Sequence, residues 1–160
     1  MNVFTVSLFG HRWIEDLRKL EKNIKPIIKE LLENNTYVNF LIGRNGDFDE
    51  YAASVIKTVR KDMGMENSEI TLVLPYTVAN IEYYEKYYDF IVIPEIVYGS
   101  HPKFSITARN RWMVENSQLV VAYVERKKGG AYEAVKYAEK TGVKIINLCD
   151  KLFPQDGRGV

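Results

Sequence analysis

Short runs of consecutive apolar residues alternate along the chain with longer segments in which apolar residues recur every three or four positions. A short continuous run is typical of a strand buried on both faces of a sheet, and the three-and-four spacing indicates an amphipathic helix. The runs predict strands at 3–9, 37–42, 70–74, 90–93, 119–124 and 143–148. The periodic segments predict helices at 14–34, 48–63, 78–88, 106–115 and 131–140.

This alternation predicts an α/β fold, because parallel strands need a crossover segment between them, usually a helix. We expect a Rossmann-like, doubly wound and mainly parallel sheet of about five to seven strands, with helices on both faces. The chain of 160 residues has the length of one domain. We predict that this domain covers residues 1–149 and that residues 150–160 form a C-terminal tail.

Three residues give finer predictions about the helices. Pro26 lies inside the first helical segment and predicts a kink or a break there, because proline removes one backbone hydrogen bond. Asp47 is the expected N-cap of the second helix, with Asp49 and Glu50 in its first turn. Gly142 is the expected C-terminal glycine of the last helix.

Charge and composition narrow the classes of function. Lys and Arg number 22 and Asp and Glu number 21, giving a net charge of +1, so we expect no general nucleic-acid binding. No segment approaches the about 20 apolar residues of a membrane span, so no membrane partner is expected. The single cysteine, Cys149, excludes an intrachain disulfide and suits a reducing cytosol, so a cytoplasmic location is predicted.

Glycine-containing loops follow three of the predicted strands, at the edge where open α/β sheets bind ligands. They read Gly10-His11-Arg12, Gly43-Arg44-Asn45-Gly46-Asp47 and, after a charged link, Gly129-Gly130-Ala131. Free N–H groups at the helix starts favour an anion, most simply a phosphate, whereas any one of these glycines alone is as readily a turn residue. The predicted ligand-binding residues are Gly10, His11, Arg12, Gly43, Asn45, Gly46, Asp49, Arg109, Asn110, Gly129, Gly130 and Glu133.

Several polar side chains near these loops are candidates for chemistry. His11 is a candidate phosphate or hydrogen-bond partner because its pKa is ordinarily near neutrality. Arg109 and Asn110 would add charge and polar contacts, or Arg109 forms an ordinary salt bridge. Asp49 and Glu133 are the candidate catalytic carboxylates, with the alternative that each only stabilises the positive start of its helix.

Two nucleotide-binding motifs are absent. The first predicted strand is not followed by G-x-G-x-x-G, and no G-x-x-x-x-G-K-[ST] occurs, so a dinucleotide fingerprint and a P-loop are excluded. Nothing in the sequence requires a metal or a cofactor, and neither is predicted. The chain contains 11 tyrosines, and those at 83–88 favour packing or self-association as a homo-oligomer over base stacking.

Four segments together resemble the SLOG superfamily, in particular a single-domain bacterial or phage branch. They are Phe9-Gly10-His11-Arg12, then Phe40-Leu41-Ile42-Gly43 with Gly46-Asp47-Phe48-Asp49, then Arg109-Asn110-Arg111-Trp112-Met113-Val114-Glu115-Asn116-Ser117, and Gly129-Gly130-Ala131. The resemblance spans roughly residues 3–148. It implies a Rossmann-like fold that binds nucleotides or nucleotide-derived ligands.

Relatives in this superfamily include cytokinin-activating phosphoribohydrolases, the DNA-processing protein of natural transformation and sensor domains of antiphage systems. The phosphoribohydrolases carry P-G-G-x-G-T-x-x-E, whereas this chain has Lys136 at the place of the catalytic Glu. The departure argues against hydrolysis but leaves phosphate binding at the helix start intact.

Three hypotheses about function follow. The first is binding of a nucleotide or nucleotide-derived small molecule, in a sensor or regulatory role, at the carboxyl ends of the strands. The second is an N-glycosidic-bond hydrolase or transferase that acts on a nucleotide, in which Glu133 or Asp49 would stabilise positive charge on the sugar. The third is a regulatory interaction protein with a vestigial pocket.

Overall fold

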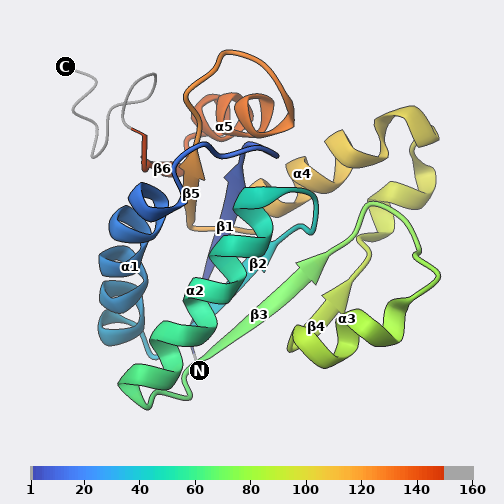
Figure 1. Cartoon of the computed structure of the whole chain (residues 1–160). Coiled ribbons are helices and arrows are strands. Elements are labelled where there is room, and N and C mark those ends of the chain that lie inside the picture. Colours follow the sequence, from blue (N-terminus) through green and yellow to red (C-terminus); the bar gives the residue numbers. More distant parts are fainter. Residues whose placement is uncertain (1, 150–160) are drawn as a thin grey trace.

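One parallel sheet organises the chain, and the computed structural model describes residues 2–149 of it (Figure 1). The strand order is β4-β3-β2-β1-β5-β6, and every neighbouring pair is parallel. The predicted α/β class and Rossmann-like topology are confirmed, whereas the predicted tail at 150–160 lies outside the described residues. The strands are β1 (Val3–Gly10), β2 (Tyr37–Ile42), β3 (Ser68–Val73), β4 (Phe90–Val92), β5 (Leu119–Tyr123) and β6 (Lys144–Asn147).

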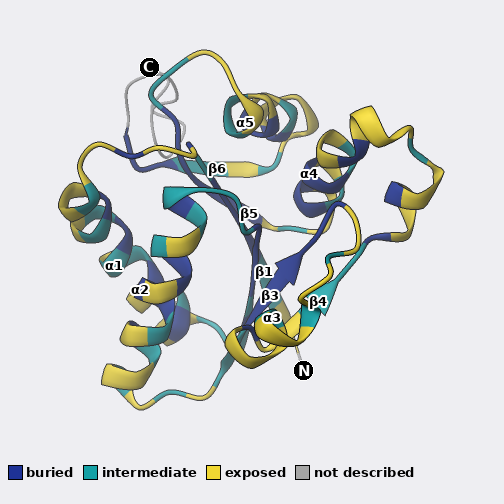
Figure 2. Ribbon diagram, turned by 45° about the vertical axis from the view of Figure 1, so that its right-hand side comes forward, coloured by how far each residue is buried: buried dark blue, intermediate teal, exposed yellow. Residues whose placement is uncertain are grey.

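Helices cover both faces of the sheet, as Figure 2 shows from the side. One face carries α1 and α2, and the opposite face carries α4 and α5. Two short 3-10 helices, which the sequence pattern did not predict, connect β4 to α4. The helices are α1 (Leu17–Asn34), α2 (Asp47–Met63), α3 (Ile81–Tyr87), η1 (Glu95–Gly99), η2 (Pro102–Phe104), α4 (Ser105–Glu115) and α5 (Gly130–Thr141). Over residues 2–149, no helix is both long and apolar enough for a membrane span.

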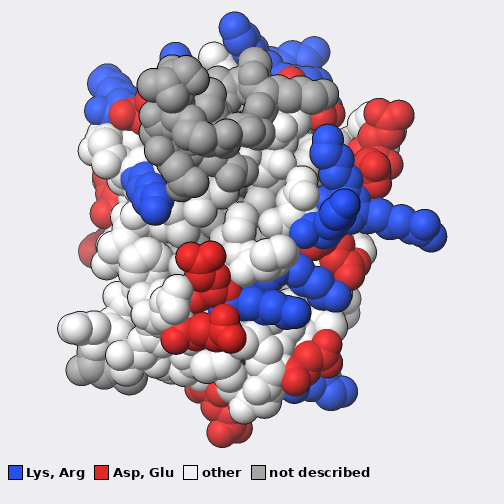
Figure 3. Space-filling view, turned by 90° about the vertical axis from the view of Figure 1, so that its left-hand side faces the viewer, with Lys and Arg blue, Asp and Glu red and all other residues white. Residues whose placement is uncertain are grey.

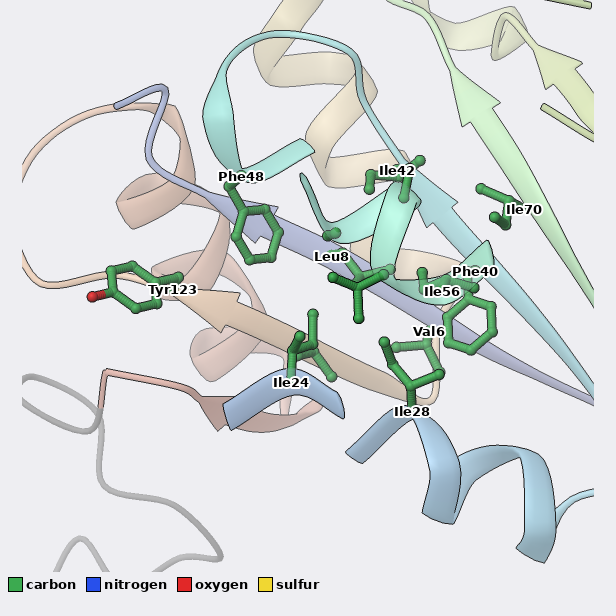
Figure 4. Close-up of a cluster of buried hydrophobic side chains, with 14 of the residues drawn as sticks. Val6, Leu8, Ile24, Ile28, Phe40, Ile42, Phe48, Ile56, Ile70 and Tyr123 are labelled. Atoms are coloured by element: carbon green, nitrogen blue, oxygen red, sulfur yellow. The ribbon is translucent and has the colours of Figure 1, made fainter. Parts of the chain in front are cut away.

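The larger core lies between the sheet and α1 with α2 (Figure 4). Ile24 and Ile28 of α1 point toward β1, where Val6 and Leu8 are fully or almost fully buried. Each such side chain contributes about 1.5–3 kcal/mol when it leaves water. The opposite core joins the sheet to α4 and α5, and α5 contributes the small side chains Ala134 and Ala138 to it.

The first helix begins later than predicted, and of the kink or break predicted at Pro26 the structure excludes the break. It begins at Leu17 rather than at residue 14, because the Asp16 carboxylate accepts a hydrogen bond from the Lys19 N–H at 3.1 Å and caps the helix there. Pro26 does not break the helix, which continues to Asn34. Ile24 and Ile28, on either side of the proline, are buried in the core, and their packing offsets the lost backbone hydrogen bond.

The predicted capping role of Asp47 is wrong, because Gly46 occupies the N-cap position and Asp47 is the first residue of α2. Its carboxylate instead accepts the Ile14 N–H at 2.8 Å, and its own N–H donates to the Arg12 carbonyl at 2.7 Å. These two contacts attach the loop after β1 to the start of α2. The attachment brings two of the glycine-containing loops side by side.

The contact between the end of β1 and the start of α2 has no room for a side chain at Gly10. A Cβ placed there would lie 2.1 Å from the nearest ring atom of Phe48, which is completely buried. Real carbon atoms do not approach so closely, so an alanine must displace the ring. The absence of a side chain at Gly10 therefore sets the distance between strand and helix.

We predict that Gly10→Ala lowers the free energy of unfolding by about 1–3 kcal/mol, because the added methyl group overpacks a full core. Urea denaturation of the two proteins measures the difference. Gly99→Ala is the matched control, since nothing lies within 4 Å of a Cβ at that position. A Gly10→Ala midpoint equal to that of the control would contradict the close contact.

Candidate functional site

A cleft of about 520 Å³ opens at the carboxyl ends of the strands, where the strand order reverses between β1 and β5. In open α/β sheets this reversal point is where ligands bind. Figure 1 shows the ends of β1 and β5 and the starts of α2 and α5 at the same side of the sheet. The predicted residues that line the cleft are Gly10, His11, Arg12, Gly43, Asn45, Asp49, Arg109, Asn110, Gly129 and Gly130.

Two predicted residues do not line it. Gly46 lies against the backbone of Arg12, behind the loop that forms the wall. Glu133 is exposed in the first turn of α5 and is not among the lining residues, although its backbone N–H donates to the Gly129 carbonyl at 3.1 Å. The structure therefore separates the two candidate catalytic carboxylates, and only Asp49 faces the cleft.

His11 connects two walls of the cleft. Its Nε2 accepts the Glu125 N–H at 2.9 Å and the Arg126 N–H at 3.3 Å, so the loop after β1 holds the loop after β5. Burial, followed by the positive charge of Arg126, lowers the pKa of His11 below its ordinary value. The neutral ring that results has an acceptor nitrogen, and its described contacts are with the protein backbone.

Arg109 forms a buried charged wall of the cleft, with 5% of its surface exposed. Its Nη1 donates to the Val73 carbonyl at the end of β3 at 2.7 Å, and its Nε donates to Asn110 Oδ1 at 2.8 Å. Burial lowers the pKa of Arg109, and the carboxyl group of Asp49 opposes that shift. The next arginine, Arg111, is exposed and lies over the ring of Tyr137, so two arginines two positions apart on α4 face different surroundings.

Gly43 lies between Asp49 and Arg109. A Cβ at Gly43 would be 2.9 Å from Asp49 Oδ2 and 3.1 Å from Arg109 Nη1, so the two side chains approach the same point over a bare backbone. The Asn45 N–H donates to Asp49 Oδ2 at 3.0 Å. Burial is the main cause that raises the pKa of Asp49 to about 7, against the opposing effect of Arg109.

Cations outnumber carboxylates on the cleft. Its lining includes Arg12, Arg109, Arg126 and Lys128, and Asp49 is its one carboxylate within the described chain. The N-terminus of α5 adds free backbone N–H groups beside Gly129 and Gly130. An anion is the ligand that this combination favours.

Eight lining residues were missed in the sequence analysis: Leu8, Phe9, Trp13, Ile106, Met113, Arg126, Lys128 and Ala131. Arg126 and Lys128 belong to the charged link after β5, and the rule that ligands meet the ends of strands applies to that link as well. Trp13 is 63% exposed, and such exposure of a tryptophan was not readable from the sequence. Among residues 2–149, no three His, Cys, Asp or Glu side chains are grouped as a metal site would require.

Two solved structures share the fold of this chain, and both are of DNA processing protein A. The protein from Streptococcus pneumoniae is 17% identical with a TM-score of 0.61, and the match covers 89% of this chain and 49% of that one. The protein from Helicobacter pylori is 16% identical with a TM-score of 0.59, and the match covers 89% of this chain and 63% of that one. This chain thus spans about half to under two thirds of their length. No protein-family model and no curated protein matches the sequence.

These likenesses confirm the Rossmann-like fold. They also correct one expectation. The near-balance of charge led to the prediction of no general nucleic-acid binding, and this prediction is wrong, because the Helicobacter pylori protein of this fold is described as binding single-stranded DNA. Net charge averages over the surface, whereas Lys and Arg gather locally on it, as on the face in Figure 3.

We predict that replacing Asp49 with Asn changes the pH dependence of stability. The folded protein keeps a proton on Asp49 up to about pH 7, whereas the unfolded chain releases it near the ordinary value of 3.8. The unfolded state therefore binds fewer protons across this interval, and wild-type stability falls as the pH rises. Relative to Asp49→Asn, the wild type loses at most about 4 kcal/mol between pH 4 and pH 8.

Urea denaturation at a series of pH values tests this. Asp62→Asn on the same helix is the control, because Asp62 is exposed. If the difference in the free energy of unfolding between wild type and Asp49→Asn does not vary with pH, Asp49 has an ordinary pKa.

Proposed function

We propose that this protein binds nucleotides, and that the cleft holds the phosphate of a nucleotide or nucleotide-derived small molecule in a sensor or regulatory role. The observation that carries the proposal is the meeting of Arg12, Arg126 and Lys128 with the free N–H groups of α5 on one cleft. Phosphate groups bind such helix starts, and cations add charge-assisted hydrogen bonds.

Trp13 supports a nucleotide over a bare phosphate. Its exposed ring lines the same cleft, and a base that stacks on an aromatic side chain gains about 1–3 kcal/mol. The volume of about 520 Å³ lies within the range of small-molecule sites.

The phosphate has two possible sources, a free nucleotide or a nucleotide within a strand. The Helicobacter pylori protein of the same fold binds single-stranded DNA, which supports a nucleotide-related ligand for this cleft. Calorimetry with mononucleotides, ADP-ribose, cyclic dinucleotides and short single-stranded oligonucleotides separates the two sources. Affinity that does not rise with oligonucleotide length supports the free nucleotide.

We predict that Lys128→Ala weakens binding of the nucleotide selected in this way by about three- to tenfold, or about 0.7–1.4 kcal/mol. Lys127→Ala is the matched control, because Lys127 is the adjacent exposed lysine and does not line the cleft. Equal affinities of the two variants would remove Lys128 from the site. No binding by wild type across the panel would favour an interaction protein with a vestigial pocket.

A second candidate function, cleavage of an N-glycosidic bond, is favoured by Asp49 alone. A carboxyl group whose pKa is about 7 exists in both protonation states near neutrality, as a general acid must. If this reaction occurs, free base is released from a nucleoside monophosphate, and Asp49→Asn lowers the rate by at least about 100-fold. Glu133→Gln, outside the cleft, serves as the control and is expected to retain the rate. Chromatography that finds intact nucleotide after long incubation with wild type excludes the reaction.

A further inference from the structure

The carboxylate of Asp49 is unexpected in a cleft for phosphate. Arg12, Arg109, Arg126 and Lys128 attract an anion, whereas Asp49, when ionised, repels it. Phosphate binding therefore does not explain why a carboxyl group lines this surface. Besides its hydrogen bond with the Asn45 N–H, this carboxyl group suits a part of the ligand that is not an anion.

The contacts of Asp49 and Arg109 hold both side chains in place. Asp49 Oδ2 accepts the Asn45 N–H at 3.0 Å, and Arg109 donates both to the Val73 carbonyl and to Asn110 Oδ1, at 2.7 and 2.8 Å. Side chains fixed in this way lose little conformational freedom when a ligand arrives. The pair is thus an acceptor and a donor in set positions before any ligand binds.

Gly43 lets both side chains come close to its backbone. A Cβ at Gly43 would lie 2.9 Å from Asp49 Oδ2 and 3.1 Å from Arg109 Nη1. Any larger residue would therefore displace Asp49 or Arg109. With glycine, a carboxyl oxygen and a guanidinium nitrogen lie close to the same point of the cleft lining.

A hydroxyl group matches this pair because it donates one hydrogen bond and accepts another. A phosphate oxygen only accepts hydrogen bonds, and ionised Asp49 repels it. An amino group of a base only donates them. Carboxylates that bind ribose hydroxyls are known from other doubly wound folds. We propose that Asp49 and Arg109, across Gly43, bind a sugar hydroxyl and select ribonucleotides over 2′-deoxyribonucleotides.

This inference rests on the proposed nucleotide site and adds the class of sugar. Asp49 also has a structural contact, since its hydrogen bond with the Asn45 N–H stabilises the start of α2 whether or not a ligand binds. A loss of affinity in an Asp49 variant would therefore be ambiguous. The ratio of affinities for two ligands that differ by one hydroxyl avoids this ambiguity, because damage to the helix start lowers both affinities together.

The experiment measures calorimetric affinities of wild type for AMP and dAMP, and for ADP-ribose and its 2′-deoxy analogue. We expect the ribose form to bind about tenfold more tightly or better, the equivalent of one hydrogen bond of about 1.4 kcal/mol. In Asp49→Ala, which removes the acceptor, the ratio falls toward one. Glu50→Gln, the adjacent exposed carboxylate of the same helix turn, keeps the wild-type ratio.

Each outcome decides a separate question. Equal affinity of wild type for both sugars overturns the hydroxyl site and leaves the nucleotide proposal standing. A wild-type ratio that persists in Asp49→Ala shows that another group binds the sugar hydroxyl and also overturns it. Failure of wild type to bind any of the four ligands contradicts the proposed function and, with it, this inference.

Discussion

A guanidinium that is almost entirely removed from water must find its hydrogen-bond acceptors within the protein, and Arg109 finds them on two elements. Its contacts with the Val73 carbonyl and with Asn110 join α4 to the end of β3. An unsatisfied charge at this depth costs several kcal/mol, so these acceptors fix the position of α4 against the sheet. The wall of the cleft and the placement of Asn110 both depend on this one buried cation.

The fold was predictable from the sequence because its causes are local and repeated. Each strand is a continuous apolar run and each long helix has one apolar face, so every predicted element is present with ends moved by a few residues. The errors come from tertiary contacts. Pro26 is tolerated since its neighbours are buried, and Asp47 serves a loop 33 residues earlier in the chain instead of capping its own helix.

The candidate site was predictable in its location and only partly in its members. Strand ends identify the right edge of a parallel sheet, and ten predicted residues indeed lie there. Packing decides which side of a helix faces the cleft. The predicted site therefore included Glu133, which does not line the cleft, and omitted Ala131, which does. Net charge was a weak ground for excluding nucleic acid, because a total over the chain carries no information about where the charges lie. A shared fold, in turn, does not settle a function, which depends on the site that the fold supports.

The connection made by His11 also affects when the cleft comes into existence. Its hydrogen bond to the Glu125 N–H joins residues 114 positions apart, and β1 cannot pair with β5 until most of the chain is available. Contacts between such distant residues form slowly, because a large loop must close before any stabilisation is gained. During synthesis the sheet can begin with β1, β2 and β3, but both walls of the cleft meet only after β5 has been added. A chain interrupted before β5 would retain β1 to β4 and lack the wall of the cleft that follows β5.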